Sequence, residues 1–171
     1  LSQTEEAKAI ARSVLSQNQG KALIIVPDSD WGNRIETAFR SQFEQGEGQI
    51  SAATRFNSAS EEYSDMLTRL LKIDESQQRK ADLQAWLGIP LSFEPSRRED
   101  FDFIFMAASP KEGRELKPLL RFHDAGEVPV YAMGRIYSGR NAIASDRDLD
   151  GIVFPITGWQ LQSAGAESPA L

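Results

Sequence analysis

Acidic and hydroxyl side chains follow one of the most apolar segments of the chain. A continuous apolar run over 22–26 leads into Asp28, Ser29, Asp30 and Trp31. Asp28 and Asp30, two residues apart in a turn, form a carboxylate pair that could bind a cation. Calcium, however, takes six or more oxygen ligands, and too few further oxygens accompany this pair. We therefore predict no metal site here, and expect Ser29 or Asp30 to cap the helix that follows.

Catalytic chemistry finds little support elsewhere in the sequence. The chain has no cysteine and one histidine, His123, so thiol catalysis and a histidine-rich zinc site are disfavoured. Nothing in the sequence suggests an orienting partner for His123, which we interpret as an ordinary helix-face histidine. The glycine-containing turn at 46–48 precedes a predicted strand, and no phosphate loop or nucleophile elbow occurs. We predict a protein that is not an enzyme and needs no cofactor.

Composition and charge narrow the class further. The chain has 171 residues, a net charge of −6 and a pI near 4.9. An acidic chain is unsuited to sequence-independent binding of nucleic acid, which needs a positive face. No apolar run approaches the roughly 20 residues of a membrane span, and we expect no direct membrane contact. The chain begins within a predicted helix and not at a methionine, so we expect a piece of a longer protein.

The candidate residues must be positioned by alternating strands and helices. A capping box at 2–5 opens the first helix, and we expect two more at 58–61 and 109–112. Pro118 should kink or split the last helix. Strands are predicted over 21–26, 49–56, 101–107, 128–132 and 151–154, with helices between them.

This order predicts an α/β fold: a doubly wound, mostly parallel five-stranded sheet with helices on both faces. We expect one α/β lobe over 1–160 and a linker or frayed tail over 161–171. Residues 74–100 exceed the minimal pattern and are interpreted as an insertion. We expect the insertion to be ordered and to fold back on the lobe through four apolar anchors, which are Trp86, Leu87, Leu91 and Phe93.

In such sheets, ligands bind beyond the carboxyl ends of the strands. That rule predicts an edge that could bind a small polar ligand or a protein surface. Caps and packing explain several of its residues equally well. Arg97 and Arg98 could form a charged rim for a partner, or could hold nearby acids and fix the insertion to the sheet. The edge comprises Asp28, Ser29, Asp30, Trp31, Ser109, Arg135, Tyr137 and Trp159.

Two stretches resemble known families. "ALIIVPDSDWGNRI" resembles the strand, turn and helix that open the second lobe of type I periplasmic binding proteins. "FEPSRREDFDFIFMAASPKEGRELKPLLRFHDAGEVPVYAMGRIYSG", followed by "DRDLDGIVFPITGW", resembles the LpoA family, earlier grouped as LppC-type lipoproteins. The resemblance covers nearly the whole chain, including the insertion. It implies one lobe of a two-lobed domain with the periplasmic-binding-protein fold.

The resemblance also implies a function and a place. Members of the family are non-catalytic regulators of peptidoglycan synthesis that bind a bifunctional class A penicillin-binding protein and stimulate transpeptidation. The parent protein would lie in the periplasm, anchored to the inner face of the outer membrane. Two alternatives stay open at this point: a receptor lobe that binds an amino acid or a cell-wall fragment, and an enzyme with a Rossmann-like fold. The missing catalytic set disfavours the enzyme.

Overall fold

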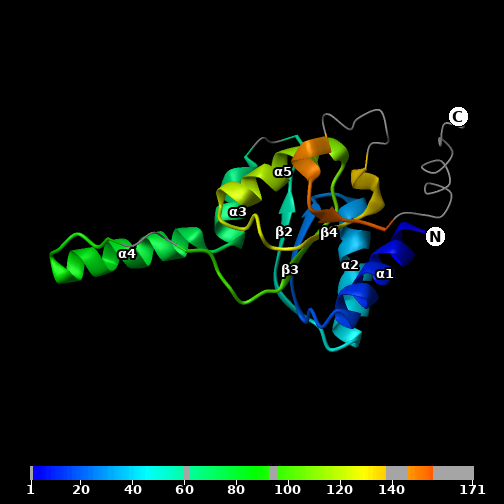
Figure 1. Cartoon of the computed structure of the whole chain (residues 1–171), viewed down its shortest axis with the longest axis horizontal. Coiled ribbons are helices and arrows are strands. Elements are labelled where there is room, and N and C mark those ends of the chain that lie inside the picture. The colour runs from blue at the N-terminus through cyan, green and yellow to red at the C-terminus, as the bar shows by residue number, and fades with distance from the viewer. Residues whose placement is uncertain (1, 60–61, 93–95, 138–145, 156–171) are drawn as a thin grey trace, which may run out of the picture.

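The computed structural model describes residues 2–59, 62–92, 96–137 and 146–155 (Figure 1). Strands and helices alternate through most of it, and two helices follow each other between β2 and β3. The elements are α1 (Gln3–Ser16), β1 (Lys21–Pro27), α2 (Asp30–Gln45), β2 (Gln49–Phe56), α3 (Tyr63–Leu70), α4 (Ile73–Leu87), β3 (Phe103–Met106), α5 (Pro110–Phe122), β4 (Val130–Ala132), η1 (Gly134–Ile136), η3 (Asp146–Leu149) and β5 (Ile152–Val153).

The strands form one parallel sheet in the order β2-β1-β3-β4-β5. β1 lies between β2 and β3, and Ile24 is in register with Ala53 on one side and Phe105 on the other. The expected five-stranded, doubly wound parallel sheet is thereby confirmed. The parallel arrangement brings the carboxyl ends of the strands to one edge, where the loops carrying most candidate residues begin.

Two apolar clusters, one on each face of the sheet, form the core. Ile24 and Phe105 pack with α1 and α2, whereas Leu23 and Met106 pack with α3 and α5. This division follows from the alternation of side chains along a strand, and explains why β3, and β1 after its exposed first residue Lys21, are apolar throughout. Phe39 of α2 stacks on Phe105 with the ring centroids 3.9 Å apart, which fixes α2 firmly on its face of the sheet.

Some local expectations were wrong. α5 runs unbroken through Pro118, so the helix is not split there, and a kink at Pro118 stays a prediction. α3 begins at Tyr63 with Glu62 at its N-cap position and no side-chain cap, so Ser58 does not cap it. β3, β4 and β5 are shorter than predicted, because apolar residues beyond the paired region look like strand in a sequence whether or not they find a neighbour.

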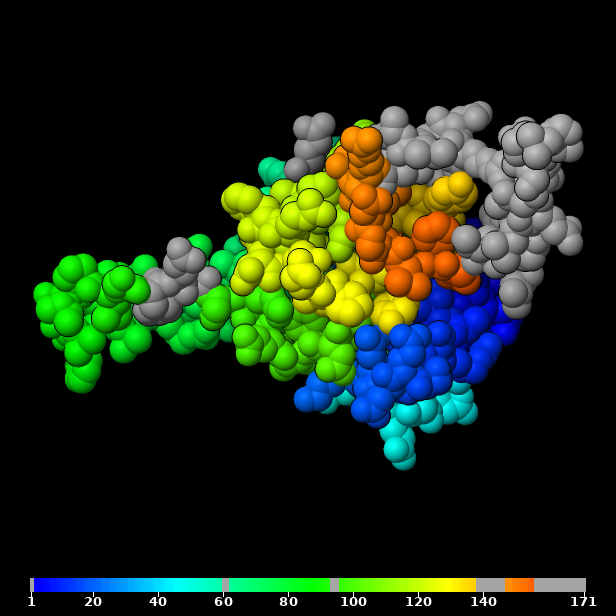
Figure 2. Space-filling view, in the orientation of Figure 1, coloured from blue at the N-terminus to red at the C-terminus, as the bar shows by residue number. Residues whose placement is uncertain are grey.

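The insertion forms a helix that leaves the lobe. Lys72, in the left-handed conformation with φ 57°, separates α3 from α4, and α4 extends away from the body of the molecule (Figures 1 and 2). The side chain of Trp86 is 82% exposed, and Leu83, Leu87 and Ile89 are exposed as well. The expectation that the anchors fold back on the lobe is therefore wrong for Trp86 and Leu87; Leu91 is half-buried, and Phe93 lies outside the described residues.

The base of the insertion, in contrast, is fixed to the lobe. Ser76 is the buried residue of α4, and its hydroxyl accepts a hydrogen bond from the Ser96 N–H at 3.1 Å, which joins the two ends of the insertion. The Arg98 N–H donates to the carbonyl oxygen of Leu71 at 2.8 Å, which joins the returning chain to the end of α3. The returning chain thus rejoins the body near the point where α4 leaves it. The boundaries at 160 and 161 stay predictions, since residues 156–171 lie outside the described part. No helix in the described ranges is long and apolar enough to cross a membrane.

Candidate functional site

The turn between β1 and α2 is built tightly around a helix cap. Ser29 is the N-cap, and its hydroxyl accepts a hydrogen bond from the Gly32 N–H at 3.1 Å. Asp30 is the first helical residue, so of the two predicted capping residues Ser29 takes the role. A side chain at position 32 would place its Cβ 1.9 Å from the carbonyl oxygen of Pro27. Glycine is therefore required where α2 passes the end of β1.

Asp28 directly follows β1, and its backbone N–H faces β2. Its N–H donates to the carbonyl oxygen of Phe56 at 2.8 Å, and both Asp28 and Asp30 are exposed. No group of three or more histidine, aspartate and glutamate side chains suited to a metal ion occurs among the residues the structure describes.

Trp31 connects α1, α2 and the loop after β4. Its indole Nε1 donates to the Gln3 side-chain oxygen at 2.8 Å. The guanidinium carbon of Arg135 lies over the indole ring, 4.9 Å from its centroid. The structure thus brings together two predicted edge residues separated by about a hundred positions. Gln3 was missed, because nothing in the sequence indicates that α1 reaches this edge.

The turn between β3 and α5 contains the predicted capping box. The Ser109 hydroxyl accepts from the Glu112 N–H at 3.4 Å, and Glu112 Oε2 accepts from the Ser109 N–H at 2.7 Å. Burial alone would raise the pKa of the Glu112 carboxyl. Hydrogen bonds from Ser58 and Ser109, with the positive charge of Arg135, hold that pKa below its ordinary value. Glu112 thus links the loops after β2, β3 and β4.

The loop after β4 is held from two sides. The Gly134 N–H donates to the Glu6 carboxylate of α1. Tyr137 stacks on Phe154 with the ring centroids 5.5 Å apart, and its side chain remains partly exposed. Trp159, the remaining predicted edge residue, lies outside the described residues.

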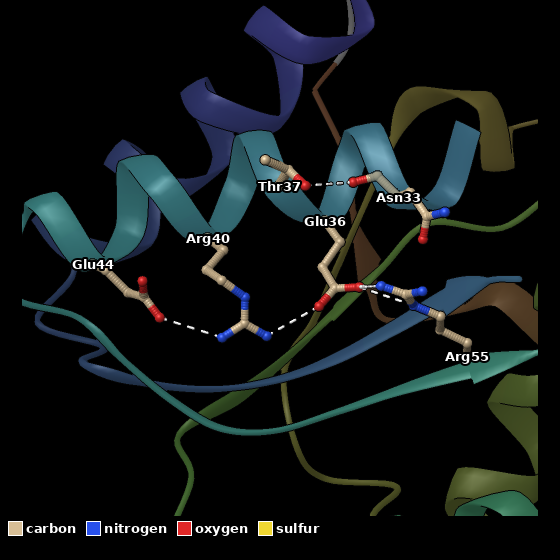
Figure 3. A network of polar contacts seen from close by, with 6 residues as sticks. All are labelled: Asn33, Glu36, Thr37, Arg40, Glu44 and Arg55. Atoms are coloured by element: carbon tan, nitrogen blue, oxygen red, sulfur yellow. Dashed lines mark hydrogen bonds and ion pairs between the residues drawn. The ribbon is translucent and has the colours of Figure 1, made fainter. Parts of the chain in front are cut away.

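A buried glutamate ties α2 to the edge strand β2 (Figure 3). Glu36 accepts from Arg40 at 3.0 Å and from Arg55 at 3.1 Å, and its side chain is 11% exposed. Arg40 also pairs with Glu44. Buried charges persist when they are paired and hydrogen-bonded, so this network indicates a structural role: it fixes the helix that carries Trp31.

Arg97 and Arg98 lie at the opposite end of the sheet. Arg98 makes a two-pronged ion pair with Asp100 at 2.6 Å, and donates to the carbonyl oxygen of Ser51 at 3.2 Å. Its side chain is 9% exposed. Arg97 donates to the carbonyl oxygen of Asp124 and lies near the ring of Phe101. These bonds support the reading in which both arginines fix the insertion to the lobe; a contact with a partner stays a prediction.

His123 has a partner that the sequence did not indicate. Its Nε2 lies 3.0 Å from the Ser64 hydroxyl of α3, and burial lowers its pKa. The pair joins the end of α5 to α3, two helices on the same face of the sheet. Its place away from the strand ends indicates packing between helices.

Most of the predicted edge residues therefore make contacts that join the loops of this edge to one another, and few of their hydrogen-bonding groups are left for a ligand. The hydroxyls of Ser29 and Ser109 are engaged at helix ends, and Arg135 lies over the Trp31 ring, with its positive charge helping to lower the pKa of Glu112. The charged side chains exposed at this edge are the carboxylates of Asp28 and Asp30 and the guanidinium of Arg135, beside aromatic rings. Such a surface is suited to contact with another protein as well as to a small polar ligand.

Comparison with known proteins assigns the family. The model described as "LppC putative lipoprotein" matches residues 1–169. The chain belongs to the LppC family. Among curated relatives, the penicillin-binding protein activator LpoA of Vibrio antiquarius is 27% identical over 157 residues, which is 90% of this chain and 25% of that protein. The chain thus spans about a quarter of the length of the relatives it matches.

Solved structures agree on the fold. The C-domain of LpoA from Haemophilus influenzae, a regulator of PBP1A, superposes with a TM-score of 0.55 at 20% identity, over 89% of this chain and 39% of that one. An ABC transporter substrate-binding protein from Desulfitobacterium hafniense gives 0.56 at 20% identity, over 88% and 35%. This LppC-family chain therefore has the fold of periplasmic binding proteins, as its sequence predicted.

Proposed function

We propose that this chain is one lobe of a non-catalytic activator of peptidoglycan synthesis, which binds a class A penicillin-binding protein and stimulates its transpeptidation. The observation that carries the proposal is the family match over residues 1–169, with curated relatives named penicillin-binding protein activators. A lipoprotein family also suggests the cell envelope. We place the parent protein in the periplasm, anchored to the inner face of the outer membrane.

The geometry of the edge supports a protein contact. Ser29 and Ser109, the hydroxyls best placed to hold a small ligand, serve as helix caps. Arg135, the one predicted basic edge residue, lies over Trp31 and near Glu112. A surface whose loops are held in place by such internal contacts can serve as a preformed face for a partner, since less side-chain entropy is then lost on association.

The receptor remains a second candidate, because the same fold occurs in substrate-binding proteins of ABC transporters. In this alternative the carboxyl edge of the sheet would hold an amino acid or a cell-wall fragment against a second lobe. Asp28, Asp30 and Tyr137 would be the groups available to that ligand. This reading predicts that a small molecule stabilises the protein, whereas the activator predicts that a synthase does.

A paired binding experiment separates the two. The chain is immobilised and exposed to a class A penicillin-binding protein, and then to a monofunctional penicillin-binding protein as a matched control. Calorimetric titrations with amino acids and muropeptides run alongside. Saturable binding of the class A enzyme alone is expected. Binding of a small molecule without binding of either enzyme would replace the proposal with the receptor.

A further inference from the structure

β2 is an outermost strand of the sheet, and among the described residues part of its outer edge is unpaired beside α3. β2 ends the strand order of the described sheet and pairs with β1. The Asp28 N–H donates to the carbonyl oxygen of Phe56, so the backbone of Phe56 faces β1. Backbone groups of successive strand residues point to opposite sides. Ala53 and Arg55 therefore direct their N–H and C=O groups outward, away from β1.

The first part of this edge, at Ser51, is already covered. Ser51 is in phase with Ala53 and Arg55, and its carbonyl oxygen accepts from Arg98. The Ser51 hydroxyl in turn donates to the carbonyl oxygen of Asp100. The segment that returns from the insertion thus satisfies the first part of the β2 edge. Beyond it, the backbone groups of Ala53 and Arg55 border a groove.

The groove is lined by positive charge. It has a volume of about 490 Å³, and arginines 55, 69 and 98 line it together with Thr54, Met66 and Leu70; none of its lining residues is acidic. Arg55 pairs with Glu36, and Arg98 pairs with Asp100. In the part of the chain that the structure describes, Arg69 donates from Nε to the carbonyl oxygen of Asp65 and is paired with no carboxylate.

We propose that the open edge of β2 binds an extended, acidic segment of a partner protein by strand addition. The outward groups of Ala53 and Arg55 would bond to its backbone, as strand edges do in this mode of peptide recognition. Arg69 would pair with a carboxylate on the added segment, and Arg55 and Arg98 would favour negative charge near it. Met66 and Leu70 supply an apolar wall for alternate side chains.

A second copy of this chain fits the edge poorly. Two β2 edges placed side by side would bring Arg55 and Arg69 of one copy close to the same residues of the other, and like charges facing each other across strands are destabilising. The carboxylates of an acidic partner would instead be attracted to these arginines. The inference rests on the open β2 edge and the groove beside it, and it does not require that the partner be a penicillin-binding protein.

The test uses a fluorescent peptide of alternating valine and glutamate as the probe. Matched probes carry lysine for glutamate, or N-methyl groups on alternate backbone amides, which remove hydrogen-bond donors while keeping the charge. We expect the glutamate peptide to bind, the other two to bind at least roughly tenfold more weakly, and the NMR amide signals of Ala53 and Arg55 to shift. Equal binding of the lysine or methylated peptide would overturn the proposal.

Variants of the chain complete the test. Arg69→Glu should weaken the glutamate peptide roughly tenfold, whereas Arg34→Glu, on exposed α2 surface across the sheet, should leave binding unchanged. Ala53→Pro removes an outward N–H at an edge position where proline is tolerated, and should weaken binding without a charge change. Unchanged binding in Arg69→Glu would contradict the proposal, as would dimers of the free chain that compete with the peptide in sedimentation.

Discussion

The guanidinium of Arg135 lies over the indole ring of Trp31, 4.9 Å from the ring centroid. Trp31 follows β1 and Arg135 follows β4, so this contact joins loops from the two sides of β3. With the hydrogen bond from Trp31 to Gln3, it fixes the carboxyl edge of the sheet as a preformed surface.

A double-mutant cycle measures this contact. Arg135→Ala and Trp31→Leu, alone and together, should give a coupling free energy of about 0.5–1 kcal/mol in urea unfolding, the usual range for an exposed cation–π pair. Arg79→Ala, an exposed arginine of α4, is the control and should show no coupling to Trp31→Leu. Additive effects of the two edge substitutions would show that the ring and the cation do not interact in solution.

The cap of α2 gives a second prediction. Ser29→Ala removes the hydroxyl that accepts from the Gly32 N–H, and should lower the free energy of unfolding by about 0.5–2 kcal/mol. Ser29→Gly should lower the free energy of unfolding by only about a few tenths of a kcal/mol, since glycine is tolerated at N-caps. If ligand or synthase binding disappears in Ser29→Gly while the melting temperature holds, Ser29 belongs to a binding site.

Gly32 allows a sharper comparison with another glycine. Gly32→Ala would force a Cβ to within 1.9 Å of the Pro27 carbonyl oxygen, whereas a Cβ at Gly20 meets nothing within 4 Å. Overpacking of this kind costs about 1–3 kcal/mol or more. Thermal melts of the two alanine variants should therefore differ clearly, with Gly20→Ala close to the parent. Equal melting temperatures would mean that the α2 turn relaxes freely.

Acid sensitivity should depend on Glu112. Its pKa in the folded protein lies below the ordinary value, so its contribution to stability is complete above the unfolded pKa of about 4.3. That contribution is lost as the pH falls through the folded pKa. Unfolding measured from neutral to acidic pH should show a shallower loss in Glu112→Gln than in the parent. Identical pH profiles would show that this carboxylate is not stabilised by Ser58, Ser109 and Arg135.

We expect substitutions of Arg98 to lower the stability of the chain. Arg98→Ala removes the ion pair with Asp100 and the bond to the Ser51 carbonyl, and should cost about 1–3 kcal/mol. Arg98→Lys keeps the charge but loses the two-pronged geometry, and should recover part of the loss. A variant with unchanged stability and slowed association with a synthase would restore the partner-rim hypothesis.

The sequence predicted those features of the fold that depend on residues close together in the chain. The unbroken apolar run of β1 indicated a strand buried on both faces, and the spacing of Ser109 and Glu112 indicated the capping box that the structure contains. Both features depend on residues within a few positions of each other. The two-sided core follows from the same periodicity, because alternate residues of β1 and β3 reach opposite clusters.

Features that depend on distant partners were not predictable in this way. Trp86 and Leu87 are apolar, which favoured packing on the lobe, yet the left-handed turn at Lys72 directs α4 outward. His123 meets Ser64, and Glu6 meets the Gly134 N–H, through contacts that only the assembled sheet creates. A single sequence contains no signal for such pairs.

Cross-linking by a class A penicillin-binding protein tests the proposed function most directly. The enzyme is incubated with lipid-linked peptidoglycan precursor, with and without a saturating amount of this chain or of the full-length protein that contains it, and the cross-linked fraction of the digested product is measured. We predict that the cross-linked fraction rises with either addition, and that a heat-denatured sample has no effect. An unchanged cross-linked fraction with both native proteins at saturation would contradict the assignment as an activator.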